Sequence, residues 1–169
     1  GGEKSFPLGT DNMGRDMLST MLYGLRTSIM IGIGAVSLQA LIGIFMGLSA
    51  GYLGGKTDAI LMRIADIQFS FPYLMLAILV GAIFQMVFGI GRYEQLAIPL
   101  LILIIGFAEW PMYARTIRAS VMREKNKEYV EAAKVIGLSK AVIMVRHVLP
   151  NSLTSLMVIS TIQIANAVM

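Results

Sequence analysis

The sequence contains no cysteine and only one histidine, His147. Without cysteine, disulfides and thiolate metal sites are excluded, and a single imidazole cannot form a multi-histidine metal cluster. The chain also lacks the G-x-x-x-x-G-K-[ST] segment that cradles nucleotide phosphates. We therefore expect these residues to bind no metal and no ATP, so that any ATP and its magnesium ion are held by another polypeptide.

Charged residues are scarce as well. They form 14% of the chain against 56% hydrophobic residues, and the mean hydropathy is +0.73. A soluble core of this size does not need so much apolar side chain. Four stretches hold no Asp, Glu, Lys, Arg or His at all, namely residues 27–55, 67–91, 95–108 and 148–169.

Three of the four uncharged stretches have the length that a bilayer requires, and 95–108 reaches it only if the helix continues through Glu109 to about Met112. A helix needs roughly 20 apolar residues to span the hydrocarbon core, and it pairs its own backbone N–H and C=O groups there. A soluble bundle does not need such runs, and a membrane β-barrel would alternate polar and apolar residues. We therefore predict an all-α integral membrane protein with a single transmembrane domain over residues 1–169. Its predicted spans are 28–52, 71–90, 95–114 and 151–169.

The distribution of lysine and arginine predicts the orientation. Of the 14 such residues, eight lie in 115–147 and two in 53–66, against three in 1–26 and one in 91–94. Cytoplasmic loops carry the excess of positive residues. We therefore expect 115–150 to be a cytoplasmic loop and 1–27 an external segment. The net charge of +4 then reflects topology and gives no reason to expect nucleic acid as a partner.

The ends of the chain indicate a longer protein. It begins with Gly1 rather than methionine and stops at Met169 inside an apolar stretch. We expect these residues to be a fragment, with at least part of a helix lying beyond them.

Three glycines, Gly43, Gly47 and Gly51, follow one another at intervals of four in the first predicted span. They share one helix face, where the missing side chains allow a second helix to approach closely. Membrane helices also tolerate scattered glycines, but three in register weaken that alternative. We predict helix packing at this face.

The segment before the second predicted span is polar. Thr57 and Asp58 suit the start of a helix, and Pro72 stands where the apolar stretch begins. Arg63 and Asp66 are three residues apart and could pair on one helix face. The segment is either a short interfacial helix bent into a span or the polar end of one kinked helix.

One carboxylate, Glu109, lies near the inner end of the third predicted span. Trp110 and Tyr113 follow it and suit the interfacial aromatic belt. Glu109 either reaches water or an arginine near the headgroups or faces a polar pathway, because a charge at mid-membrane is costly. Uncharged polar residues in spans usually bond between helices. The possible pathway residues are Gln85, Glu109, Ser152, Ser155, Gln163 and Asn166.

The loop 115–150 contains the pattern of a short amphipathic helix. Tyr129, Ala132, Ala133 and Ile136 fall at i, i+3, i+4 and i+7, on one helix face. So short a helix is marginal alone and must pack on another surface. The small alanines suit contact with a protein partner. A helix that lies on the lipid surface remains the alternative, although such helices favour Trp, Phe and Leu on the apolar face.

Capping residues predict where this helix begins and ends. Asn126 can cap its start, and Gly137 can end it in a left-handed C-cap. Ser139 can cap a second short helix. We expect that helix to end at Leu149 and Pro150, because proline cannot donate a backbone hydrogen bond.

The same stretch, EYVEAAKVIGLSKAVIMVRHVLPN, resembles the EAA loop of permease subunits from ATP-binding-cassette importers. That loop reads E-A-A, three residues, G, nine residues and then I-x-L-P. The matching positions are Glu131, Ala132, Ala133, Gly137, Leu149 and Pro150. His147 replaces the usual isoleucine, and this variant is similar to the dipeptide, oligopeptide and nickel branch.

Other motifs resemble the same branch, and together they cover essentially the whole chain. They are PLGTDNMGRD over 7–16, YGLR over 23–26, Asp66 with Phe71 and Pro72, and Trp110 with Arg115 and Arg118.

The resemblance implies a type I importer fold that crosses a prokaryotic inner membrane several times. Two permease subunits would form the pathway, two ATPase subunits would bind the cytoplasmic loops, and an external solute-binding protein would deliver the solute. The implied coupling residues are Glu128, Tyr129, Glu131, Ala132, Ala133, Ile136 and Gly137. The loop end comprises His147, Leu149, Pro150 and Asn151.

The implied cargo is a peptide, or a related small solute such as a nickel chelate or glutathione. A membrane anchor or scaffold without transport is the alternative, and it predicts that function does not depend on the loop. An intramembrane enzyme would need a nucleophile with a base, and only Glu109 with a serine is at hand. We therefore do not expect an enzyme.

Overall fold

The computed structural model describes residues 8–11 and 13–168, and helices are the regular elements of this part of the chain. They are α1 (Met17–Leu53), α2 (Gly55–Phe69), α3 (Tyr73–Phe88), α4 (Ile90–Glu124), α5 (Glu128–Val135), α6 (Lys140–Val142), the π-helical turn η1 (Ile143–Val148) and α7 (Leu149–Val168). The all-α prediction is thus confirmed. Pro7 and Asn12 of the first motif, and Met169 of the last predicted span, lie outside the described residues.

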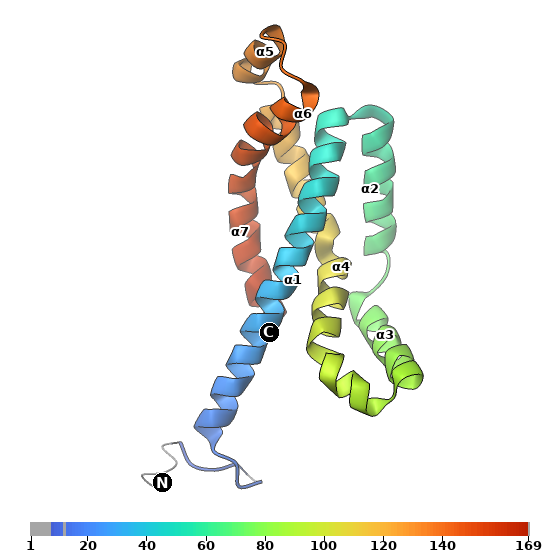
Figure 1. Cartoon of the computed structure of the whole chain (residues 1–169), viewed down its shortest axis with the longest axis vertical. Coiled ribbons are helices and arrows are strands. Elements are labelled where there is room, and N and C mark those ends of the chain that lie inside the picture. The colour runs from blue at the N-terminus through green and yellow to red at the C-terminus, as the bar shows by residue number, and fades with distance from the viewer. Residues whose placement is uncertain (1–7, 12, 169) are drawn as a thin grey trace.

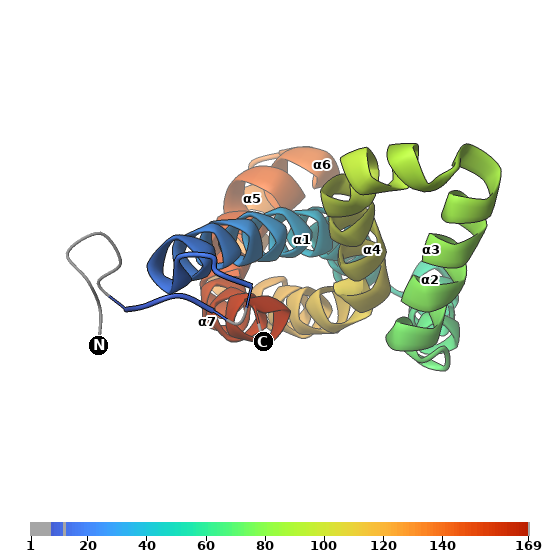
Figure 2. The same cartoon turned by 90° about the horizontal axis from the view of Figure 1, so that it is seen from below.

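Two long helices form the centre of the molecule. α1 has 37 residues and α4 has 35, and each is long and apolar enough to cross a membrane by itself. At 1.5 Å per residue each exceeds roughly 50 Å, so both extend beyond a hydrocarbon core of about 30 Å. The two helices run in the same direction. α7 lies on one side of them, and α2 and α3 lie on the other side of α4 (Figure 1, Figure 2).

The three glycines of α1 lie against α4. A Cβ atom on Gly43 would stand 2.2 Å from Tyr113 Cβ, and one on Gly47 would stand 2.4 Å from the backbone oxygen of Ala114. Gly51 meets α4 one turn further on in the same way. The backbone of α4 therefore occupies the space that side chains would need, and the two helices touch along this face.

Two arginines of α4 bind α2. Arg118 donates two hydrogen bonds to the Asp58 carboxylate, one of them over 2.6 Å. Arg115 Nη2 lies 2.6 Å from Asp66 Oδ1. The predicted pairing of Asp66 with Arg63 is therefore wrong, because Asp66 finds its cation on the neighbouring helix rather than on its own.

The chain bends at the start of the second predicted span and within the fourth. The chain breaks before Pro72, and the axes of Gly55–Phe69 and Leu74–Phe88 differ by 77°. This angle supports the interpretation of a short helix bent into a span. The axes of Lys140–Thr154 and Leu156–Asn166 differ by 55°. The described residues therefore contain two helices that can span alone, and up to four spans if each bent pair counts as one.

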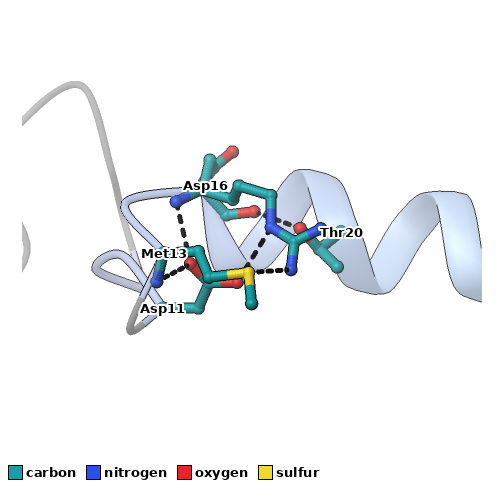
Figure 3. A network of polar contacts seen from close by, with 5 residues as sticks. Asp11, Met13, Asp16 and Thr20 are labelled. Atoms are coloured by element: carbon teal, nitrogen blue, oxygen red, sulfur yellow. Dashed lines mark hydrogen bonds and ion pairs between the residues drawn. The ribbon is translucent and has the colours of Figure 1, made fainter.

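A compact turn precedes α1 (Figure 3). Asp11 Oδ1 accepts hydrogen bonds from the backbone N–H groups of Met13 and Arg15, and the Arg15 guanidinium reaches Asp11 Oδ2 over 3.1 Å. Asp16 is the N-cap of α1 and accepts from the Ser19 backbone N–H and hydroxyl. The Ser19 hydroxyl in particular holds the pKa of the Asp16 carboxyl below its usual range. This part of the first motif therefore fixes where α1 begins.

The loop elements gather at one end of the molecule. α5 and α6 lie at the end where α1 finishes and α2 starts, and the start of α1 and the turn from α3 to α4 lie at the opposite end (Figure 1). This grouping agrees with the predicted sidedness, in which 53–66 and 115–150 share the cytoplasmic side. The sidedness itself stays a prediction.

Candidate functional site

Helix α5, in the loop after α4, has eight residues and begins at Glu128. Its N-cap is Lys127 and not the predicted Asn126, whose side-chain amide instead donates to the Met122 carbonyl over 3.2 Å. Among the described residues no side chain caps α5, but Glu128 and Glu131 lie in its first turn. Carboxylates there interact favourably with the helix dipole and stabilise the start of the helix.

Gly137 follows the end of α5 in the left-handed conformation, with φ of +86°. The Leu138 N–H donates to the Ala133 carbonyl over 3.2 Å, and the Gly137 N–H donates to the Lys134 carbonyl over 3.0 Å. These two bonds make a Schellman motif, so the predicted left-handed C-cap is confirmed. A Cβ atom on Gly137 would meet no described atom within 4 Å, and only the backbone conformation demands glycine here.

The two sides of α5 differ in burial. Val130 and Ala133 are buried in the same apolar core as Val121 of α4 and Val148 of η1. The opposite side carries an exposed row at i, i+3, i+4 and i+7. We call this row the outward stripe, and it consists of Glu128, Glu131, Ala132 and Val135.

The predicted contact face is displaced from this stripe by one residue. The structure buries Ala133, half-buries Tyr129 and exposes Ala132 and Ile136, so these four residues do not share one environment. A shift of one residue turns a helix face by about 100°. Val135 belongs to the stripe and was not predicted, although the periodicity counted from Glu128 would have found it.

Tyr129 joins three elements. Its hydroxyl donates to Glu124 Oε2 over 2.7 Å and accepts from Asn151 Nδ2 over 3.3 Å. Asn151 also donates to the His147 carbonyl over 3.0 Å. Burial raises the pKa of the Tyr129 phenol, and the bonded Glu124 raises it further, so the hydroxyl keeps its proton and acts as a donor. α5 is therefore tied to the end of α4 and to the start of α7.

The chain from α6 to α7 is a continuous helix. Ser139 Oγ accepts from the Val142 N–H over 3.4 Å, which is the predicted cap. The helix does not end at Leu149 and Pro150 as predicted, because η1 passes directly into α7. A π-helical turn replaces the usual i to i+4 backbone hydrogen bonds with i to i+5 bonds. Here that turn lies shortly before Pro150, which has no backbone N–H to donate. Leu149 packs on the core, and Pro150 is exposed.

Three of the possible pathway residues lie together between α4 and α7. Gln163 Nε2 donates to Glu109 Oε2 over 2.5 Å, and Asn166 Nδ2 donates to Gln163 Oε1 over 3.0 Å. Nearby, the Tyr113 hydroxyl donates to Ser160 Oγ over 3.4 Å. Within the described part of the chain no ion pair involves Glu109. We call Glu109, Gln163 and Asn166 the polar cluster.

The other possible pathway residues do not join the polar cluster. Gln85 is exposed on α3, and that helix lies well away from α7 (Figure 1). Ser152 is buried and donates to the Val148 carbonyl over 2.9 Å, within its own helix. The side chain of Ser155 lies outside what the structure describes. Among described side chains, no three of the His, Cys, Asp and Glu type lie together as a metal site would require.

Known proteins resemble this chain closely. Residues 40–169 match the family described as binding-protein-dependent transport system inner membrane component. The chain is 37% identical over 169 residues to a dipeptide transport system permease protein of Haemophilus influenzae, covering 100% of this chain and 54% of that protein. It is 35% identical over 160 residues to an oligopeptide transport system permease protein of Bacillus subtilis, covering 95% and 49%. It is also 35% identical over 161 residues to a glutathione transport system permease protein of Pectobacterium atrosepticum, covering 95% and 50%.

The chain thus spans about half the length of the curated relatives it matches. The matched residues include the outward stripe, Tyr129 with its partners and the polar cluster. Apolar helices able to cross a bilayer agree with an inner-membrane location. The chain therefore has the type I importer permease fold and belongs to the family of binding-protein-dependent transport system inner membrane components.

Proposed function

We propose that this chain is part of the permease subunit of an ATP-driven importer and that α5 is the helix on which a separate ATPase subunit acts. The outward stripe carries this proposal. Val135 is 88% exposed and the adjoining Ile136 is 77% exposed, in a loop outside the predicted spans. Apolar side chains so exposed beside charged ones are typical of a surface that a partner covers.

The rest of the stripe suits a protein groove. Glu128 and Glu131 are exposed, and among the described residues neither takes part in an ion pair. Their carboxylates are available to cationic or polar groups at the rim of a groove, while Val135 enters its apolar floor. The small side chain of Ala132 permits close approach to the backbone of α5.

The inner side of α5 can transmit movement to the spanning helices. Val130 and Ala133 belong to one core with Leu48 of α1, Ile117 of α4 and Leu156 of α7. Because close-packed cores shift between discrete arrangements rather than deform continuously, a displaced α5 moves its neighbours with it. ATP and its magnesium ion, bound and hydrolysed by two ATPase subunits, would drive this displacement and open the path alternately to each side.

The polar cluster is the proposed part of the path. A carboxylate in a spanning helix without an ion-pair partner is a functional candidate by default. Glu109 would attract the ammonium group of a passing peptide, and Gln163 and Asn166 would offer amide groups to its backbone. A second permease subunit would complete the path from the other side.

Peptides are the proposed cargo, delivered by an external solute-binding protein. Two of the relatives are named for dipeptides and oligopeptides, and a third is named for glutathione, which is itself a small peptide. A nickel chelate is less well supported as cargo, because the polar cluster offers groups that suit a peptide. A scaffold without transport is less well supported, because the outward stripe offers a surface on which an ATPase can dock.

The test is co-purification of the ATPase subunits with the full-length permease carrying Val135→Glu. Val135 is so exposed that the change leaves the fold intact, but it places a carboxylate in the apolar floor of the groove. We expect about a tenfold loss of bound ATPase or more. Val145→Glu, at a residue 54% exposed on η1, is the matched control and should retain the ATPase. Equal retention in both variants would contradict docking on α5.

A further inference from the structure

A cleft of about 480 Å³ lies under the loop, between the ends of α1 and α4 and the elements α5 and α6. It is separate from the outward stripe and from the polar cluster. Its lining residues are Tyr52, Leu53, Lys125, Asn126, Lys134, Leu138, Lys140 and Ile143.

The lining is cationic. Lys125, Lys134 and Lys140 contribute three ammonium groups, and none of the described residues that line the cleft has a carboxylate. Lys125 is held in place because its Nζ donates to the Gly51 carbonyl over 2.8 Å. Asp58 interacts electrostatically with Lys125, but its carboxylate already accepts two hydrogen bonds from Arg118. The cleft therefore keeps an excess of positive charge that an anion would neutralise.

The remaining lining is apolar, and it lies where the predicted membrane ends. Tyr52 and Leu53 are the last residues of α1 and belong to the charge-free stretch 27–55. Leu138 and Ile143 face them from the loop. A ligand that fits must therefore carry an anionic group for the lysines and an apolar part directed toward the bilayer.

We propose that this cleft binds the phosphate headgroup of an anionic phospholipid, with the lysines around the phosphate and the acyl chains leaving past Leu53. Basic pockets between helices on the cytoplasmic side suit anionic headgroups. A free phosphate would use the same lysines but would leave the apolar lining without a purpose. Acidic side chains of an ATPase docked on the outward stripe would have to reach around the side of α5, because Lys134 is exposed but lies one turn after the buried Val130 and outside the stripe. The bound lipid would brace the loop against the ends of α1 and α4.

The test is native mass spectrometry of the assembled transporter, purified with the full-length permease and exposed to an equal mixture of phosphatidylglycerol and phosphatidylethanolamine. The wild type should retain phosphatidylglycerol in preference to phosphatidylethanolamine. Each lysine near an anionic surface contributes about fivefold to binding, so Lys134→Gln with Lys140→Gln should lower this retention about 25-fold. Arg146→Gln removes one exposed charge of the same loop outside the cleft and should leave it nearly unchanged.

Three results would overturn the proposal. Equal loss of phosphatidylglycerol in the Arg146→Gln control would show a diffuse charge effect. Displacement of the lipid by millimolar inorganic phosphate would assign the cleft to a free anion. Loss of the ATPase subunits from the double variant with lipid retention unchanged would assign the lysines to the protein partner. Lipid retention is measured without any transport assay. A negative lipid result would therefore not contradict docking of an ATPase on α5, and a negative docking result would not contradict lipid binding in the cleft.

Discussion

Tyr129 donates a hydrogen bond to Glu124 over 2.7 Å, which fixes the short helix α5 to the last turn of α4. Asn151 of α7 donates to the same hydroxyl over 3.3 Å. One phenol thus connects the helix that bears the outward stripe with two of the helices that cross or enter the membrane. A displacement of α5 reaches both helices through this side chain as well as through the apolar core.

Tyr129→Phe tests this connection. Phenylalanine keeps the ring in the core but removes both hydrogen bonds, at a loss of about 1 kcal/mol for each. In the reconstituted transporter we expect less solute moved per ATP hydrolysed, with ATPase binding unchanged. Tyr23→Phe, at a residue 69% exposed on α1, is the control and should keep the normal ratio. A normal ratio in Tyr129→Phe would rule out a role for these two bonds in coupling.

Gly137→Val tests the orientation of α5. The φ of +86° costs a side-chain-bearing residue about 1–2 kcal/mol, and a β-branched residue suffers most. We expect the loop to leave the Schellman motif and transport to uncouple from ATP hydrolysis, whereas Gly137→Asn should retain coupling. Gly91→Val, in open space on α4 without a left-handed backbone, is the control for the added side chain. Wild-type transport by Gly137→Val would count against the cap.

Gly47→Ala tests the contact of α1 with α4. The new Cβ would lie 2.4 Å from the Ala114 carbonyl oxygen, so the two backbones must separate. Overpacking of this kind costs about 1–3 kcal/mol and should lower the Tm of the purified complex. Gly24→Ala, also in α1 but in open space, should raise stability by up to about 1 kcal/mol through helix propensity. Shifts of the same sign in the two variants would argue against close packing at Gly47.

Glu109→Gln tests the polar cluster. The amide oxygen can still accept the bond from Gln163, so the change removes charge and preserves packing. Loss of a charge-assisted contact to a peptide ammonium group should lower uptake about tenfold, with Tm and ATPase binding unchanged. Glu94→Gln makes the same chemical change at an exposed residue near the start of α4 and should transport normally. Normal uptake by Glu109→Gln would leave the cluster a purely structural role.

Features with a local cause could be predicted from the sequence. Charge-free stretches of sufficient length signal spanning helices because lipid leaves the backbone no other partner. Gly137 after an amphipathic pattern signals a left-handed cap, and Ser139 signals the start of the next helix, because each acts on its own neighbouring N–H groups. For both Gly137 and Ser139, the hydrogen bonds that form the cap join residues no more than five positions apart in the chain.

Features set by tertiary contacts could not be predicted. Asp66 bonds Arg115 on α4 because the two helices pack together, and nothing near Asp66 in the sequence indicates that choice. Which side of α5 is buried depends on Val130, which enters a core built from four other elements. That tertiary contact overrides the weak amphipathic pattern of an eight-residue helix. The polar cluster joins residues 54 positions apart, so only the fold reveals that Glu109 and Gln163 belong together.

Site-specific crosslinking is the most direct test that α5 docks on an ATPase through its outward stripe. Ala132→Cys and Ala133→Cys would be introduced singly into a full-length permease free of other cysteines, in membranes that contain the ATPase subunits. These neighbours differ sharply in the structure, because Ala132 is exposed and Ala133 is 5% exposed. We predict a crosslink to the ATPase from Ala132→Cys and none from Ala133→Cys. Labelling of Ala132→Cys by lipid probes alone would contradict the account and return α5 to a helix on the membrane surface.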